Sequence, residues 1–169
     1  MTIDQAALGS AVKAVIAAAG GDDTEAMYEA VMPPAGVDTP PAEAANWFGL
    51  LLIHLALTAA RASHLEQGCS REAVAGWIGD VLGPLPTPAL LRGEDPGRID
   101  HVEAVKAVEA YARCRDYAVD LVRIGLTDPE EEPDPRGVDA HCAVTNDKRT
   151  RITVMALLGR LAADPAARG

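Results

Sequence analysis

The longest apolar stretch of the chain, residues 49–60, constrains the fold more than any other feature. Its sequence, GLLLIHLALTAA, is hydrocarbon apart from His54 and a single threonine. Even extended back to Trp47, the stretch falls well short of the roughly 20 apolar residues that span a bilayer, and the charged Arg61 follows it at once. We therefore expect a central helix that neighbouring helices cover on all sides, and we expect no membrane partner.

Composition favours helices in the rest of the chain as well. Aromatic residues make up only 4% of the sequence, whereas alanine and leucine, which favour helices over strands, are abundant. With 169 residues, 49% of them hydrophobic, the chain is long enough to bury a substantial core without disulfides or metals. The sequence therefore predicts a single all-α domain over residues 1–169, built as an irregular bundle of five to six helices.

Prolines, glycines and capping residues indicate where these helices begin and end. A side-chain oxygen just before a helix accepts hydrogen bonds from its free N–H groups, whereas glycine and proline end helices. The expected helices cover residues 4–19, 24–32, 40–67, 71–82, 95–126 and 147–162. Their expected N-terminal caps are Asp23 or Thr24, Thr39, Ser70, Asp95, and Asn146 or Asp147.

The remaining segments are expected to be irregular. Residues 83–97 are rich in proline and glycine and permit no more than a single turn, near Pro88. Residues 127–137 alternate prolines with carboxylates and predict an extended, flexible loop, whose run of glutamates either meets a basic partner or keeps the loop solvated. Residues 138–145 fit a short strand or a helical turn equally well, and residues 164–169 are expected to fray.

The charge of the chain argues against nucleic-acid binding. A formal net charge of −10 at pH 7 repels phosphate backbones. The only compact basic group, KRTR at residues 148–151, is expected to be a solvated helix end. No nucleic-acid partner is therefore expected.

The cysteines and the N-terminus predict the compartment. Cys69, Cys114 and Cys142 are odd in number and form no C-x-x-C motif, which disfavours a disulfide framework. Asp4 stands where a signal peptide would carry basic residues, so no signal peptide is expected. These features predict a cytoplasmic protein.

Four residues are candidates for binding a small anionic ligand. On a helical projection of residues 40–67, His54 and Arg61 share one mixed seam, and in residues 95–126 Arg115 lies with Tyr111 inside an apolar arc. A buried arginine needs a carboxylate, phosphate or carbonyl partner because it keeps its charge. The ligand site would lie between the third and fifth helices. The favoured alternative makes His54 a packed core residue and pairs Arg115 with a Glu or Asp across the core or places it at an oligomer interface.

The opposite face of the fifth helix carries Glu109, Asp116 and Asp120, which could bind Mg²⁺ through water. The paired acidic motifs of helical phosphohydrolases are absent, however, and Arg113 and Arg123 stand beside these carboxylates. A solvated face laced with ion pairs is the favoured interpretation.

A zinc site whose ligands converge from distant segments is a weak hypothesis, because a cysteine on a helix usually packs as a small hydrophobic residue. The candidate ligands are His64, Cys69, Cys114, His141 and Cys142. Adjacent His141 and Cys142 rarely adopt the geometry of a catalytic pair, and no glycine-rich phosphate loop is present. We therefore expect no catalytic residue, metal or cofactor.

These observations favour a non-enzymatic, helical binding or regulatory protein. It would act through protein–protein contacts, with a protein partner or by self-association into a homo-oligomer. A small-ligand sensor or carrier with a pocket between the third and fifth helices is the first alternative. An Mg²⁺-dependent, all-α phosphohydrolase is the second.

Overall fold

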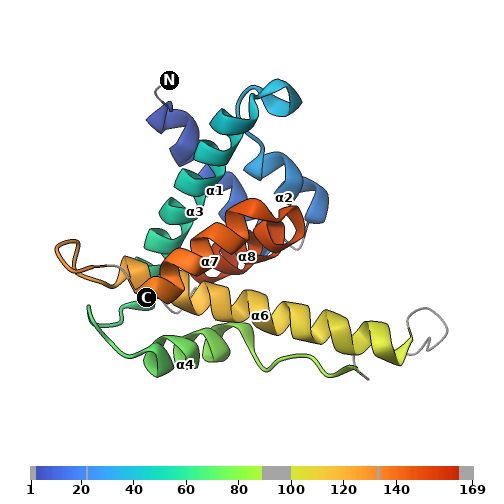
Figure 1. The fold of residues 1–169 in the computed structure, drawn as a ribbon, viewed down its shortest axis with the longest axis vertical. Helices are drawn as coiled ribbons and strands as arrows, with labels where there is room; N and C mark the ends of the chain where they lie inside the picture. The colour runs from blue at the N-terminus through green and yellow to red at the C-terminus, as the bar shows by residue number, and fades with distance from the viewer. Residues whose placement is uncertain (1–2, 22, 89–99, 133, 164–169) are drawn as a thin grey trace.

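A computed structural model describes residues 3–21, 23–88, 100–132 and 134–163 of the chain. These residues form α-helices and one 3-10 helix, Gly36–Asp38, and include no strand, which confirms the all-α class (Figure 1). The α-helices are α1 (Gln5–Gly20), α2 (Thr24–Val31), α3 (Pro41–Ser63), α4 (Arg71–Leu82), α6 (His101–Gly125), α7 (Pro135–Asn146) and α8 (Lys148–Ala162). The described residues thus hold seven α-helices, more than the five to six expected.

The core lies where α3 and α8 meet. Leu51 and Leu55 of α3 and Met155 and Leu158 of α8 are fully buried. Helix α8 packs against α1, α3, α6 and α7, and α4 packs along one side of α6 (Figure 1). The centre of the bundle is therefore shared by two helices.

Helix α3 is not covered on all sides, so that part of the prediction is wrong. Ile53 is 39% exposed, and Leu50 and Leu57 are only half-buried, because α1, α6, α7 and α8 leave one side of α3 open. Among the described residues, α3 is also the one helix long and apolar enough, by length and composition alone, to cross a membrane; 33% of that apolar window is buried.

Helix α3 ends at Ser63, four residues before the expected end. The Ser63 hydroxyl donates to the Ala60 carbonyl at 2.6 Å and accepts from the Leu65 N–H at 3.1 Å, which draws the chain out of the helix. His64 then adopts a left-handed conformation, with φ of 54°. Gly68, the expected end, instead donates its N–H to the Leu126 carbonyl at 2.8 Å.

Three predicted caps are confirmed. The side chains of Asp23, Ser70 and Asp147 accept backbone N–H bonds at 3.0 to 3.1 Å at the starts of α2, α4 and α8. The prediction for Thr39 is wrong. Its hydroxyl donates to the Gly36 carbonyl at 2.7 Å rather than capping α3, which follows Pro40.

Helix α6 begins at His101, later than expected, because Asp100 accepts the Glu103 N–H at 2.7 Å and caps it. The predicted start at Asp95 lies outside the described residues. Most of the turn expected near Pro88 also lies outside the described residues, as do residues 164–169, which were expected to fray.

Residues 138–145, for which the sequence fitted a short strand or a helical turn equally well, are helical and belong to α7. Helix α7 starts at Pro135, inside the stretch expected to be a loop, because Asp134 caps it and proline needs no N–H partner in a first turn. Before it, the Asp128 carboxylate accepts the Glu130 N–H at 3.0 Å and bends the chain into a turn rather than an extended segment. The expected loop is therefore both shorter and more structured.

The basic group at residues 148–151 begins α8, yet it is not wholly solvated. The guanidinium of Arg151 stacks on the Phe48 ring of α3, 3.7 Å from its centroid, and donates to the Thr145 carbonyl of α7 at 2.7 Å. Burial lowers the pKa of Arg151, an effect that the charge of Asp147 opposes. Arg151 thus joins α3, α7 and α8.

Candidate functional site

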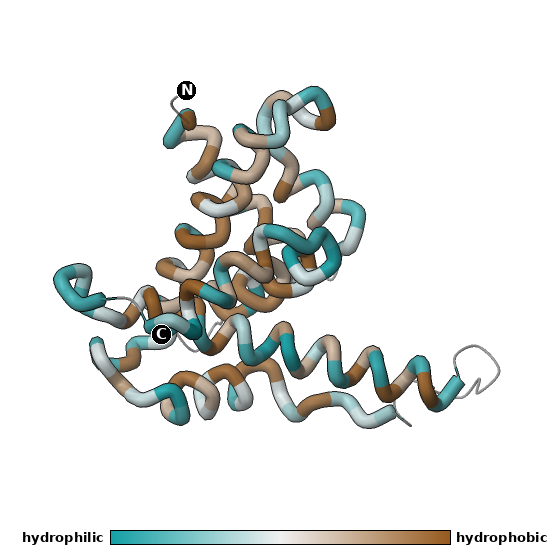
Figure 2. Tube along the Cα trace, in the orientation of Figure 1, coloured by the Kyte–Doolittle hydropathy of each residue, from teal (hydrophilic) through white to brown (hydrophobic). Residues whose placement is uncertain are grey.

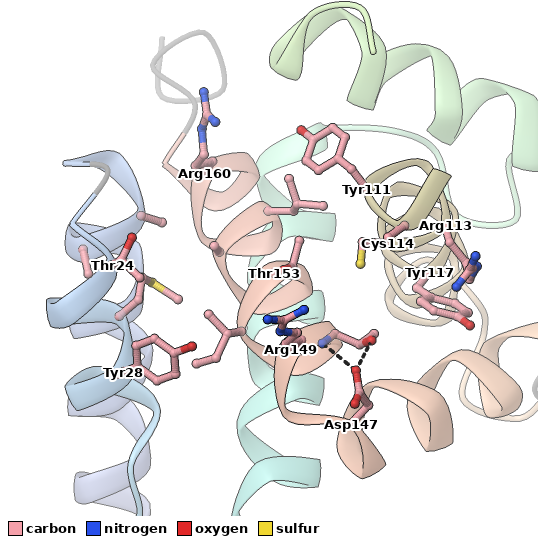
Figure 3. A pocket seen from close by; sticks show the side chains of 18 of the residues that line it. Thr24, Tyr28, Tyr111, Arg113, Cys114, Tyr117, Asp147, Arg149, Thr153 and Arg160 are labelled. Atoms are coloured by element: carbon pink, nitrogen blue, oxygen red, sulfur yellow. Dashed lines mark hydrogen bonds between the residues drawn. The ribbon is translucent and has the colours of Figure 1, made fainter. Parts of the chain in front are cut away.

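A groove of about 790 Å³ lies between α2 and α6, with α8 as its floor (Figure 3). Its volume falls within the range of roughly 300 to 1,000 Å³ that is usual for ligand sites. No residue of α3 lines it.

The floor of the groove is one face of α8. Arg149, Thr153, Ala156 and Arg160 follow one another at spacings of four, three and four residues, which places them in a line along the helix. The two arginines lie about 16 Å apart along the axis, at the ends of the line. Because the side chains between them are small, the middle of the floor is open to a ligand.

Tyrosines form the walls. Tyr28 comes from α2 and is 39% exposed, while Tyr111 and Tyr117 come from α6 and are half-buried. Figure 3 shows Tyr28 on one side of α8 and Tyr111 and Tyr117 on the other. The ammonium of Lys148 lies 5.4 Å from the centroid of the Tyr28 ring. Each wall therefore offers a ring for stacking and a hydroxyl for hydrogen bonding.

The groove is positively charged although the chain carries a net charge of −10. Arg113, Arg149 and Arg160 line it, and none has a carboxylate within 4.0 Å in the described part of the chain. The two carboxylates of the lining, Asp23 and Asp147, cap α2 and α8.

The hydrogen bonds that occupy Asp147 also keep it ionised. The hydroxyl and N–H of Thr150 donate to Oδ2 of Asp147 at 2.6 and 3.0 Å and, with nearby arginines, lower its pKa. Asp147 therefore acts as the cap of α8, and the guanidiniums of Arg113, Arg149 and Arg160 remain available to an anionic ligand.

Cys114 lies in the wall that α6 forms, where it is 6% exposed. Burial raises the pKa of this thiol, and the charge of Arg113 only partly offsets the rise. Because the thiolate is the nucleophile of cysteine chemistry, a raised pKa suits a packed side chain rather than a reactive one.

The four residues predicted to bind a ligand do not share this groove. Tyr111 lines it, but His54 and Arg61 lie on α3, half-buried and exposed respectively. Arg115 donates from Nη1 to the Gly83 carbonyl at 2.8 Å and so holds the end of α4. The partner of Arg115 is therefore a backbone carbonyl and not the Glu or Asp that the favoured alternative expected.

The acidic face of α6 forms ion pairs, as the favoured interpretation expected, but Asp120 is buried rather than solvated. Arg71 of α4 lies 2.9 Å from Oδ1 of Asp120 and 3.7 Å from Oδ1 of Asp116. The described residues contain no group of three or more His, Cys, Asp or Glu side chains that could hold a metal ion. Arg71 therefore pairs with two of the three carboxylates, Asp116 and Asp120, that the magnesium hypothesis assigned to the metal ion.

Sequence reasoning missed most of the groove. Arg149 belongs to the basic group at residues 148–151. Its spacing to Thr153, Ala156 and Arg160 indicates a common face of α8, so this part of the groove could be found from the sequence. Tyr28, in contrast, reaches the same groove only because the fold places α2 opposite α6. No local sequence pattern predicts that α2 lies opposite α6.

Comparisons of the chain with protein-family models, with curated proteins and with solved structures gave no match. Function is therefore inferred from the groove.

Proposed function

We propose that this chain is a non-enzymatic binding protein that holds an acidic helical segment of a partner protein in the groove over α8. One observation carries the proposal. On a chain with a net charge of −10, three arginines that lack a carboxylate within 4.0 Å in the described residues gather around an apolar, tyrosine-walled groove. Such an arrangement favours an occupant that is anionic and partly apolar.

The spacing of the floor favours a helical occupant. Arg149 and Arg160 are separated by about three helical turns, so acidic residues at the two ends of a short helix would meet one arginine each. Thr153 and Ala156 lie between them, and their small side chains allow the apolar face of that helix to come close. This is the helix-in-groove mode of recognition, with charge pairs fixing the register.

The chemistry of the groove favours binding over catalysis. A general base or nucleophile needs a lone pair that is available near working pH. The carboxylates of Asp23 and Asp147 are held at the starts of α2 and α8 by cap hydrogen bonds, those of Asp147 lower its pKa, and burial raises the pKa of Cys114. The side chains that remain, arginine and tyrosine, are typical of recognition surfaces.

A small anionic molecule with an aromatic ring is the second candidate. The volume of about 790 Å³ suits it, and Tyr28 and Tyr111 could stack on such a ring while Arg149 binds its anionic group. A flexible molecule of this kind would need fewer contacts along α8 than a helix does. The two candidates therefore differ in their dependence on Arg160.

Fluorescence anisotropy with a labelled synthetic helix tests the proposal. The probe is a 14-residue peptide with glutamates at both ends of a stripe of leucine and alanine, and its counterpart carries lysine in place of glutamate. We expect the acidic peptide to bind with a Kd in the micromolar range and the lysine peptide not to bind. Replacement of both arginines, Arg149→Ala/Arg160→Ala, should weaken binding at least about tenfold.

A matched variant controls for net charge. Lys13→Ala/Arg136→Ala removes the same two positive charges from exposed positions outside the groove and should leave the Kd unchanged within about twofold. Equal loss in both variants would mean that only overall charge matters, and no binding of either peptide would refute the peptide proposal. Competition by ATP that needs Arg149 but not Arg160 would favour the small molecule.

A further inference from the structure

The open side of α3 carries an apolar stripe, Leu50, Ile53 and Leu57, that is separate from the groove. These residues follow at spacings of three and four and therefore share one side of the helix. Ile53 is 39% exposed and the two leucines are half-buried. Figure 2 shows apolar residues recurring along α3. An apolar stripe at the surface favours a further contact.

A polar side chain, Asn46, bounds this stripe on the N-terminal side. The exposed Asn46 stands one turn before Leu50 on the same side of α3, so the apolar surface ends there. The stripe is therefore short, and its contact must be specified by the polar and charged groups around it.

Two opposite charges stand beyond the ends of the stripe. Glu43 and Arg61 are 18 residues apart, which is five full turns, so they lie on one line along α3 about 27 Å apart. On a helical projection this line falls beside Leu50, along the edge of the stripe. Neither side chain has an opposite charge within 4.0 Å among the residues described.

We infer that a second copy of this chain covers the stripe, with the two α3 helices packed antiparallel about a two-fold axis at the level of Leu52. Positions 43 and 61 are equidistant from that level, so Glu43 of each copy lies opposite Arg61 of the other. A two-fold interface uses the same surface twice and must be self-complementary. The stripe with its two flanking charges meets this requirement.

The same arrangement gives His54 a place. Positions 50 and 54 are also equidistant from Leu52, so the half-buried His54 ring of one copy lies beside Leu50 of the other. In an antiparallel pair, the same edge of each helix lies against the other. The contacts between His54 and Leu50 therefore lie between the two ion pairs of Glu43 and Arg61. No groove residue takes part, so this interface is independent of the proposed function.

A bilayer surface is the other occupant that such a stripe could meet, and charge argues against it. The net charge of −10 opposes an anionic membrane surface. Glu43 and Arg61 lie at equal distances from Leu52. A lipid surface offers no paired charges at that spacing, whereas a second copy of the chain pairs both side chains.

Sedimentation velocity with charge-swapped variants tests the inference. The wild-type chain should be a dimer at tens of micromolar. Glu43→Arg places two arginines on each helix and Arg61→Glu places two glutamates, so each variant alone should dimerise at least about tenfold more weakly. An equimolar mixture should dimerise again, because arginines then face glutamates. The double variant Glu43→Arg/Arg61→Glu should also recover the dimer.

Controls separate the interface from the fold. Ile53→Glu should give a monomer with unchanged helical circular dichroism, while Val102→Glu, at an exposed valine of α6, should leave the dimer intact. A monomeric wild-type chain, or single variants that mixing does not rescue, would overturn the inference. Binding of a monomer to phosphatidylcholine vesicles that Ile53→Glu abolishes would overturn it in favour of a membrane surface.

Discussion

Arg71 of α4 donates from Nε to Oδ1 of Asp120 on α6 at 2.9 Å, and the side chain of Asp120 is 10% exposed. This hydrogen bond is the largest cause of the raised pKa of Arg71. Because Asp120 is buried, it depends on Arg71 to compensate its charge. The pair therefore fixes α4 against α6.

The first prediction concerns this pair. Arg71→Met leaves Asp120 buried without its partner and should lower the free energy of unfolding by about 1 to 3 kcal/mol. The double variant Arg71→Met/Asp120→Leu removes both charges and should lose less, which urea denaturation would measure. A double variant less stable than Arg71→Met would contradict the role given to the buried carboxylate.

The second prediction concerns the close approach of α6 to α3. A Cβ atom on Gly125 would lie 2.8 Å from the Ala60 Cβ and 3.3 Å from the Ala56 carbonyl oxygen. Gly125→Ala should therefore force the helices apart and cost about 1 to 3 kcal/mol of unfolding free energy. Gly76→Ala in α4, where a Cβ meets nothing within 4 Å, should instead stabilise by about 0.5 to 1 kcal/mol. Equal effects at the two positions would refute the packing argument.

The third prediction concerns Arg151. Lysine keeps a positive charge but cannot stack a planar group on Phe48 while it donates to the Thr145 carbonyl. Arg151→Lys should lower the free energy of unfolding by about 1 to 2 kcal/mol. The same exchange at exposed Arg149 should change it by less than about 0.5 kcal/mol. Thermal melts of the two variants side by side would test this difference.

The fourth prediction concerns acid stability. The Arg136 N–H bond, with Arg123, lowers the pKa of Asp134, the cap of α7. As the pH falls, the unfolded chain therefore takes up this proton first, near its usual pKa of about 3.9. The stabilisation is present above that pH and is lost as the pH falls through the lower pKa of the folded chain.

Asp134→Asn provides the test, because asparagine also caps helices but does not titrate. Between pH 5 and pH 3 the free energy of unfolding should fall less steeply in this variant than in the wild type. Urea denaturation at several pH values would measure both slopes. Parallel slopes would show that Asp134 does not contribute to acid unfolding.

Local chemistry explains which parts of the fold were predictable. Asp23, Ser70 and Asp147 accept bonds from N–H groups three residues ahead, so a short sequence window contains the whole interaction. The end of α3 was missed because Ser63 bonds the backbone on both sides of itself, and a competing side-chain bond of this kind is hard to weigh against helix propensity.

Long-range partners explain the misses at the candidate site. The apolar arc of α6 correctly indicated that Arg115 needs a partner, but the partner is the Gly83 carbonyl, 32 residues earlier in the chain. Tyr28 and Tyr111 line the same groove only because α8 lies between their helices (Figure 3). Periodicity predicts the face of a helix and does not predict which other helix stands opposite.

The most direct test of the central claim is an NMR titration of ¹⁵N-labelled protein with the acidic 14-residue peptide. If the groove over α8 holds an acidic helix, amide shifts should move at Tyr28, Tyr111, Thr153 and Arg160 and should saturate together. The same peptide should leave the amides of Ile53 and Leu57, on the other exposed face, in place. Shifts confined to α3, or no saturable shift in the groove, would contradict the account.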